Sequence, residues 1–386
     1  MLKIFNNSPK KIYLDYNSST PILPEVIKYA EPFYNNYYYN PSAKYALPLK
    51  EYLVDAKSKI MNLLNAMDGK IVFYNSGTEA ISSFLQGIAW NCLYTNNPKR
   101  HIISSSIEHD ATLNTLEHLK ILGFKIDLID VDKNGVVDIE KLEKTITKDT
   151  LLVSIMHVNN ETGIIQPIKN ISKITKKNNV FFHCDGIASV GKTNIDIQDL
   201  GVDAYTITAH KFYGPKGSAI SYINNNINLK PIVIGSKQEY GLKGGTENVA
   251  GLVCLTKALE IICNSQNSYI KKETEMLSNF EENLKKNIDD FVINSHKDYR
   301  VCNTLNVSFA KVKSADIIKK LSDKGVCVSL GAASVGDEFS HVIKALGVDS
   351  YYAKGTIRFS IGKFTTQQEL DDTVIILKDI IQELRK

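Results

Sequence analysis

Residues Val202 to Gly217 read VDAYTITAHKFYGPKG, and this stretch decides the fold of the chain. The alternating β-branched and aromatic residues from Ala204 to Thr208 predict a strand, and the Gly-Pro-Lys-Gly sequence that closes the stretch predicts a turn. Between the two stand His210 and Lys211, so a lysine is placed at the end of a strand, where it can reach into a cleft. Taken alone, Lys211 is better interpreted as an ordinary solvated lysine, because an isolated lysine carries little functional information.

A second strand lies upstream, in the sequence NVFFHCDGIASV from Asn179 to Val190, and it ends at Asp185. Asp185 precedes Lys211 by 26 residues, which is enough for one strand-connection-strand unit. An aspartate and a lysine at adjacent strand ends suit pyridoxal 5'-phosphate (PLP): the lysine forms a Schiff base, and the carboxylate keeps the pyridine nitrogen protonated. The competing interpretation is a buried Asp-Lys ion pair.

A phosphate seat is predicted where the strand Lys70 to Tyr74 runs through NSGTE into a helix from about Ala80 to Trp90. Free backbone N–H groups and the positive end of the helix dipole suit a phosphate there. Ser76 and Thr78 are also ordinary helix-capping residues. Lys211 downstream favours the phosphate site.

Four motifs, HCDGIASVGK, AHKFYGPKG, GGTENVAG and GTIRFSIGKF, follow one another along the chain. In order and spacing they resemble cysteine desulfurases of the NifS/IscS-like group, in the class V aminotransferase family, and the similarity runs from about Tyr13 to about Thr373. The resemblance implies an α/β fold-type I PLP-dependent transferase, with a mostly parallel, seven-stranded-type sheet in a large PLP-binding domain at 14–258. A smaller α+β domain would combine 1–13 and 259–386. The alternation of strands and helices itself predicts a mostly parallel sheet with helices on both faces.

The resemblance also implies the cofactor site. Lys211 would bind PLP and then move the Cα proton of the substrate, Asp185 would sustain the electron sink, and His109 would cover the cofactor ring. Asn160 would contact the ring oxygen. The phosphate would be held by Ser76, Gly77, Thr78, Thr208, His210 and, across a homodimer interface, the partner subunit's Thr246.

An amino-acid substrate, L-cysteine in the family, is implied by Arg358, which matches the arginine that binds the α-carboxylate with both ends of its planar fork. Asn40 and Asn160 match further substrate contacts. A sulfur-acceptor or scaffold protein is a possible partner, as in iron-sulfur cluster assembly. Several family positions differ here: Tyr45 and Leu47 replace a His and a Gly, Ala188 replaces a Gln, and Tyr240 and Lys243 replace two arginines.

The departure that bears most on the reaction is Ser334, which stands where the family has a catalytic cysteine in a mobile loop. A serine hydroxyl is hardly ionised near neutral pH and cannot store sulfur, whereas a thiol readily becomes a nucleophilic thiolate. Persulfide chemistry at residue 334 is therefore excluded, and a deliberate Cys-to-Ser change would look identical. The loop is also about two residues shorter than in the group.

Two other cysteines lie near predicted site residues. Cys327 precedes Ser334 by seven residues, roughly 23 Å of extended chain, so it would reach the substrate only through a refolded loop. We expect it to be a buried strand cysteine. Cys184 should point to the strand face opposite Asp185 and contribute to packing.

Composition restricts the remaining possibilities. The chain has 386 residues, is 43% hydrophobic and 23% charged, and carries a net charge of only +4, so a nucleic-acid partner is not indicated. Its six cysteines form no C-x-x-C pair, which argues against a metal site and a disulfide scaffold. No apolar run reaches membrane-spanning length and Met1 to Lys11 lacks a signal-peptide core, so a cytoplasmic protein is expected.

Three functions remain open at this stage. The first is a desulfurase-like enzyme that acts on L-cysteine with a sulfur acceptor other than residue 334. The second is a PLP-dependent lyase or aminotransferase, which needs only Lys211. The third is a degenerate paralogue that binds a desulfurase or scaffold without catalysis, and the presence of Lys211, Asp185, His109 and Arg358 together argues against it.

Overall fold

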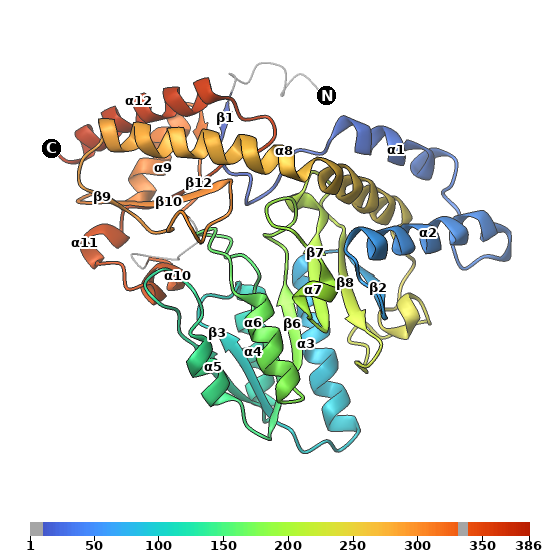
Figure 1. Cartoon of the computed structure of the whole chain (residues 1–386). Coiled ribbons are helices and arrows are strands. Elements are labelled where there is room, and N and C mark those ends of the chain that lie inside the picture. The colour runs from blue at the N-terminus through green and yellow to red at the C-terminus, as the bar shows by residue number, and fades with distance from the viewer. Residues whose placement is uncertain (1–10, 331–338) are drawn as a thin grey trace.

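The computed structural model describes residues 11–330 and 339–386, and its largest feature is a seven-stranded sheet (Figure 1). In spatial order the strands are β2 (Gly69–Tyr74), β8 (Ala219–Asn224), β7 (Ala204–Thr208), β6 (Phe181–Asp185), β5 (Thr150–Ser154), β3 (His101–Ser105) and β4 (Lys125–Ile129). Neighbours from β7 to β4 are parallel, and β8 is antiparallel to both β2 and β7. The predicted α/β fold with a mostly parallel sheet is confirmed.

Helices cover both faces of this sheet because alternate strand residues point to opposite sides. On one face, Val72, Ile102 and Leu152 pack into a core with α3 (Gly77–Tyr94) and α4 (Asp110–Ile121). On the other face, the core contains strand residues such as Ile71 and Val153, together with helices α1 (Pro24–Asn35), α2 (Leu47–Leu63), α5 (Ile139–Thr145), α6 (Ile168–Lys177), α7 (Ile197–Leu200) and the first half of α8 (Val249–Asn287).

A second hydrophobic core lies at the other end of the chain's longest helix. It joins the second half of α8 to a three-stranded antiparallel sheet of β12 (Thr356–Ser360), β10 (Thr304–Phe309) and β9 (Phe291–Ile293). Helices α9 (Ser314–Asp323) and α12 (Gln367–Leu384) complete this core, and α12 runs alongside α8 in Figure 1. The predicted boundary between two domains, near residue 258, stays a prediction.

Short elements connect the two cores. Strand β1 (Ile12–Tyr13) pairs in parallel with β11 (Val326–Cys327), so the chain's N-terminal segment joins the second core. The remaining short elements are η1 (Lys44–Ala46), η2 (Ala209–Lys211), η3 (Glu239–Gly241), α10 (His341–Ala345) and α11 (Ser350–Ala353). In the part of the chain that the structure describes, no helix combines the length and apolar composition needed to cross a membrane.

Candidate active site

The candidate site is built around Lys211, which ends η2 directly after β7. Its Nζ donates hydrogen bonds to two carbonyl oxygens of the N-terminal segment, Asn17 O at 2.6 Å and Ser18 O at 3.1 Å. The β7 strand therefore delivers the amine, and a segment almost 200 residues away fixes its position.

The proton affinity of Lys211 is lowered by its surroundings. Burial is the main cause, and it brings the pKa of the amine to about 8. The positive charges of Arg358 and Lys192 also lower this pKa, while Asp15 and Asp185 oppose them. A larger share of neutral amine is thus present near neutral pH, and the neutral amine is the form that attacks a carbonyl group.

Asp185 lies beside Lys211 because β6 and β7 are adjacent parallel strands with Asp185 opposite Thr206. Its carboxylate is 5% exposed and accepts a hydrogen bond from the backbone N–H of Ile187 at 2.9 Å. Burial raises the pKa of Asp185, whereas this hydrogen bond and the charges of His109 and Lys211 lower it. The carboxyl group of Asp185 is therefore buried, and a positively charged partner would stabilise its ionised form.

A cleft of about 440 Å³ opens above these two residues. Most of the residues that the sequence predicted for the site line this cleft: Ser76, Gly77, Thr78, His109, Asn160, Asp185, Thr208, His210, Lys211 and Arg358. They come from the carboxyl ends of the parallel strands, from the start of α3 and from β12. The expected side chains are therefore gathered in one place.

The start of α3 forms one wall of the cleft. Ser76 is the N-cap, and its Oγ accepts a hydrogen bond from Glu79 N at 3.0 Å, so the capping role considered for Ser76 is present. The first N–H groups of a helix have no partner within the helix and can bind an anion. Gly77 has no side chain that would collide with its neighbour in this wall: a Cβ at residue 77 would come within 2.4 Å of Ile187 Cδ1.

Arg358 forms the wall on the β12 side and is 3% exposed. Its Nη2 donates to Asp15 Oδ1 at 2.6 Å and to Ser18 Oγ at 2.8 Å, and its Nη1 donates to the carbonyl oxygen of Asn160 at 2.9 Å. Among the described residues its Nε has no hydrogen-bond partner although it is buried. The guanidinium is held rigidly and keeps a donor for an acidic group.

The arrangement fits PLP. A lysine of lowered pKa and a buried acid lie at neighbouring strand ends, and a helix N-terminus opens onto the same cleft as His210. The buried Nδ1 of His210 has no partner in the described part of the chain, as is expected of a group that contacts a polar ligand. Lys211 would anchor the cofactor, Asp185 would pair with its ring nitrogen, and the start of α3 with His210 would hold its phosphate.

Two buried glutamates in the cleft were not predicted. Glu108 accepts hydrogen bonds from Ser105 Oγ at 2.5 Å and from Met156 N at 3.0 Å, and burial raises its pKa to about 8. Burial also raises the pKa of Glu161, whose neighbours include Arg358. Each glutamate is adjacent in sequence to a predicted site residue, His109 or Asn160. This adjacency is the sequence feature from which the two glutamates could have been predicted as site residues.

Asn17 and Ser18 also line the cleft and were missed as site residues. His341, at the start of α10, was missed as well; its Nε2 lies 3.0 Å from the carbonyl oxygen of Glu108. Nothing in the local sequence of these residues distinguishes them from loop and capping residues.

Two described residues among those predicted for the site do not line the cleft. Asn40 is exposed, and its Oδ1 accepts a hydrogen bond from Ser42 N at 2.9 Å within its own turn. Thr246 is also exposed. Ser334 lies outside the described residues. The roles assigned to these three residues stay predictions.

The cysteines are all free, and Cys184 is fully buried in the main core, as predicted. The expectation of a buried Cys327 is wrong, because this residue is only half-buried. The physical reason is its position: β11 forms a two-stranded sheet with β1 and, in the part of the chain that the structure describes, has no strand on its other side. Cys327 is not among the residues that line the cleft.

Comparison with known proteins supplies the family. Residues 12–372 match the family model described as "Aminotransferase class-V". A cysteine desulfurase IscS of Dictyoglomus turgidum is 38% identical over 97% of this chain and 96% of its own length. A solved NifS-like protein has a TM-score of 0.90 at 33% identity, covering 97% of this chain and 100% of that chain. A structure titled "SspA in complex with cysteine" has a TM-score of 0.81 at 31% identity, covering 92% and 100%.

Proposed function

Because the chain belongs to the class V aminotransferase family and is a PLP-dependent, cysteine desulfurase-like member of it, we propose that it releases sulfur from L-cysteine to give L-alanine. The observation that carries this proposal is Arg358, whose guanidinium is fixed by Asp15, Ser18 and Asn160 and which lines the same cleft as Lys211. An arginine fork is the preferred protein partner of a carboxylate. The cleft thus suits an α-amino acid, and a similar protein has been solved with cysteine.

Lys211, Arg358 and Asp185 would each have a different role in this reaction. PLP, when bound, supplies an electron sink for the pair released at the Cα atom of the substrate. Lys211 Nζ would take the Cα proton and return it, since its lowered pKa increases the share of neutral amine that can accept a proton. Arg358 would orient the substrate through its carboxylate, and Asp185 would hold the ring nitrogen in its protonated form.

Sulfur release must then occur without a thiol at residue 334. With a reductant the balanced reaction is L-cysteine plus two electrons and two protons giving L-alanine and hydrogen sulfide. The electrons come from a small thiol or from a sulfur-acceptor protein. In either case the donor would accept the sulfur directly from the substrate. Cys327 is the nearest cysteine in sequence, but its place outside the cleft gives it no contact with the substrate.

A second reaction is favoured by Ser334 itself. β-Elimination converts L-cysteine and water to pyruvate, ammonia and hydrogen sulfide, and it needs neither a nucleophilic cysteine nor a reductant. The same Lys211, Asp185 and Arg358 would serve it. The two reactions differ in their carbon product, alanine or pyruvate, and in their need for a reductant.

The enzyme is proposed to be a homodimer. Six tyrosines with large exposed surfaces gather on α1, η1 and α2 and the loop between them: Tyr29, Tyr34, Tyr38, Tyr39, Tyr45 and Tyr52. A concentration of exposed aromatic residues indicates a protein interface. The exposed position of Thr246 is compatible with a contact to the phosphate site of a partner subunit.

Product analysis tests the function. The PLP-loaded protein is incubated with L-cysteine, with and without dithiothreitol, and alanine, pyruvate, ammonia and sulfide are quantified. Alanine and sulfide in equal amounts, dependent on the reductant, are the expected result. Pyruvate and ammonia without a reductant would establish the elimination, and absence of turnover would refute both reactions on L-cysteine.

Three variants serve as controls. Lys211→Ala should abolish turnover. Ser334→Cys should increase desulfuration and carry a persulfide at residue 334, detectable by mass spectrometry. Cys327→Ala should leave the rate unchanged, because this residue does not line the cleft.

A further inference from the structure

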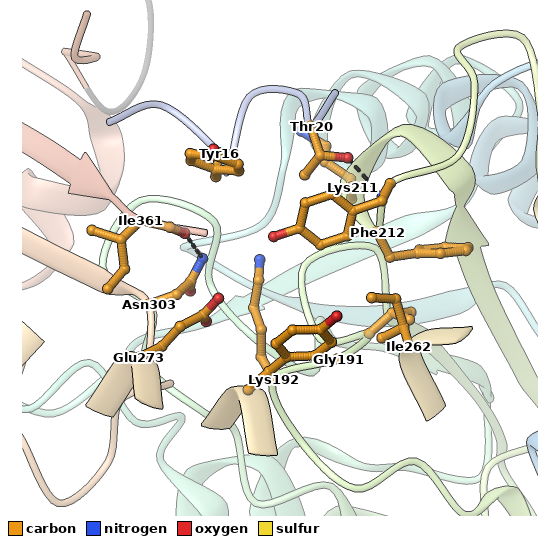
Figure 2. A pocket seen from close by; sticks show the side chains of 13 residues that line it. Tyr16, Thr20, Gly191, Lys192, Lys211, Phe212, Ile262, Glu273, Asn303 and Ile361 are labelled. Atoms are coloured by element: carbon orange, nitrogen blue, oxygen red, sulfur yellow. Dashed lines mark hydrogen bonds between the residues drawn. The ribbon is translucent and has the colours of Figure 1, made fainter. Parts of the chain in front are cut away.

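A second, small cavity of about 20 Å³ lies behind Lys211. Lys211 lines both this cavity and the large cleft, so the lysine forms part of the wall between them. Figure 2 shows the side chain of Lys192 extending into the small cavity, with Glu273 and Asn303 on one side of it. Lys192 follows β6, and Glu273 belongs to α8, so the cavity lies where the two cores meet.

The amine of Lys192 is linked to Lys211 through a single residue. Lys192 Nζ donates a hydrogen bond to Asn17 Oδ1 at 3.0 Å, and the carbonyl oxygen of Asn17 accepts the 2.6 Å hydrogen bond from Lys211 Nζ. Asn303 Nδ2 also donates to Asn17 Oδ1, at 3.2 Å. Two donors therefore hold the Asn17 side chain, and one of them carries a charge.

Asn17 also reaches the substrate side of the site. Its Nδ2 donates to Thr304 Oγ1 at 2.8 Å and to the carbonyl oxygen of Asn160 at 3.2 Å. The same Asn160 oxygen accepts the hydrogen bond from Arg358 Nη1. A change in the position of Asn17 would therefore alter the hydrogen bonds that hold both Lys211 and Arg358.

The positive charge of Lys192 is balanced by the carboxyl group of Glu273, which lies near it without forming an ion pair. Although part of the residue is exposed, burial of its amine lowers the pKa to about 8, while Cys302 and Glu273 act to raise it and Arg358 to lower it. Glu273 is 7% exposed, and burial raises its pKa to about 7 although its Oε2 accepts a hydrogen bond from Cys302 Sγ at 3.4 Å. No ion pair within 4 Å joins Lys192 to Glu273 in the described structure, and the cavity has room for one water molecule.

We propose that Lys192 is a positioning residue for Lys211. Through Asn17 it fixes the carbonyl group that holds the Lys211 amine, and its positive charge, balanced by Glu273, favours the neutral form of that amine. The proposal adds to the proposed function, but it concerns the free Lys211 amine and does not depend on which amino acid is the substrate.

The direction of the effect follows from the charges that face Lys211. Arg358 and Lys192 lower its pKa, and Asp15 and Asp185 raise it. Replacing Lys192 by a neutral residue removes one lowering charge and leaves both raising charges. The pKa of Lys211 must then increase, whereas a change of the hydrogen bond alone would not produce this shift.

The test uses the full chain without PLP and measures the titration of Lys211 directly. Reductive methylation by formaldehyde modifies only neutral amines, and the Lys211 peptide is quantified by mass spectrometry as a function of pH. Lys192→Met removes the donor and the charge, Lys192→Gln keeps a donor without the charge, and Lys192→Arg keeps both. Lys363→Met is the matched control, because Lys363 lies over the ring of Tyr269, which lines the same cavity.

We expect a midpoint near 8 for the wild-type chain. The midpoint should move up by roughly half to one pH unit in Lys192→Met and Lys192→Gln, and it should not move in Lys192→Arg or Lys363→Met. Identical midpoints in the wild type and both neutral variants would overturn the proposal. Should Lys192→Met fail to fold, as judged by circular dichroism, Lys192→Gln decides the result.

The rate of PLP capture tests the positioning part separately. At a pH where Lys211 is fully neutral, Lys192→Met should capture PLP roughly tenfold more slowly than the wild type, because Asn17 is less firmly held. Lys192→Gln and Lys192→Arg should recover most of this rate. Equal rates in Lys192→Met and the wild type would show that Lys192 does not position Lys211.

Discussion

Arg358 shows at the scale of a single residue how the site combines rigidity with binding capacity. Three protein groups occupy its Nη1 and Nη2, while Nε is buried without a partner among the described residues. An unpartnered buried donor is costly unless a ligand satisfies it. The contacts to Asp15, Ser18 and Asn160 use three of the five N–H donors and fix the guanidinium, and Nε is among the donors that a substrate carboxylate would find free.

Arg358→Lys should raise KM for L-cysteine by roughly 10- to 100-fold, because a charge-assisted hydrogen bond is lost. The ammonium keeps the charge but lacks the planar fork. Steady-state kinetics of product formation measure the change. Arg385→Lys, at the end of α12, is the control and should leave KM unchanged, since Arg385 donates to the carbonyl oxygens of Asp289, Asp290 and Ala310. An unaltered KM in Arg358→Lys would contradict carboxylate binding by this residue.

Glu108 gives a second prediction, on stability. Its pKa is about 8 in the folded chain, against an ordinary value of 4.5, because the side chain is buried. Between these two values the unfolded chain is ionised while the folded chain keeps the proton, so stability falls as the pH rises through this range. Glu108→Gln removes the ionisation, keeps an acceptor for Ser105 and Met156, and should be more stable at pH 7 by on the order of 2 kcal/mol.

Urea unfolding of the chain without PLP, repeated between pH 4.5 and pH 8, measures this difference. The two curves of free energy against pH should meet near the lower limit and separate as the pH rises. Glu117→Gln is the control, because Glu117 is exposed on α4 and pairs with Lys120. Parallel curves for the wild type and Glu108→Gln would contradict a protonated Glu108.

At the scale of elements, the beginning of α3 forms the wall of the cleft at which the cofactor phosphate would bind. Gly77→Ala should weaken PLP binding about tenfold, because the new Cβ would lie 2.4 Å from Ile187 Cδ1 and would push this side chain into the cleft that both residues line. Fluorescence or absorbance titration of the chain with PLP measures the dissociation constant.

Ile187→Val provides the matched rescue, since valine lacks the Cδ1 atom that meets the new methyl group. The double variant Gly77→Ala with Ile187→Val should bind PLP nearly as tightly as the wild type. A double variant no better than Gly77→Ala would mean that Gly77 is required for another reason, such as the direction of its N–H group.

The elements that carry Lys211 and Asp185 could be predicted from the sequence because their signals are local. Alternation in residues 204–208 and a turn after Lys211 determine β7 and η2, and parallel neighbours necessarily bring their carboxyl ends together. Residues 151–158 form one mostly apolar run, yet β5 ends at Ser154 because the following residues turn toward the cleft. Local patterns specify where an element lies more reliably than where it ends.

Contacts between distant segments could not be predicted in the same way. Asn17 meets Lys192, Asn303 and Lys211 only after both cores have assembled, and its amide has no local feature that indicates this role. Glu108 likewise is buried where distant residues meet it, with Met156 N donating to its carboxyl group and His341 next to its carbonyl oxygen. Sequence signals thus identified most of the predicted site residues that line the cleft, and the fold was needed to find the residues that hold them in place.

At the scale of the whole molecule, the site lies between the two hydrophobic cores. Asp185 ends β6 and Lys211 follows β7 of the seven-stranded sheet, Arg358 belongs to the three-stranded sheet, and Asn17 bridges them. Because the site takes residues from both cores, the relative position of the cores determines the geometry of the site. We propose that the two cores mark the two domains, with α8 crossing from one to the other.

A complete site in the proposed homodimer would also need Thr246 from a second chain. We therefore expect that mixing two inactive variants, Lys211→Ala and Thr246→Ala, restores activity at limiting PLP after the subunits exchange. One of the two sites in each mixed dimer then has an intact Lys211 together with an intact Thr246 from its partner. With random exchange, half of the dimers are mixed, and activity should recover to roughly a quarter of the wild-type value.

The alternative arrangement, with Thr246 acting on the phosphate of its own chain, makes the opposite prediction for the same mixture. Each chain would then carry one defective site whatever its partner, so the activity would remain at the sum of the two separate variants. The exposed Thr246 lies outside the cleft of its own chain, which favours the first outcome. Analytical ultracentrifugation of the wild type should give the mass of two chains, and a monomer would rule out a shared site whatever the activity of the mixture.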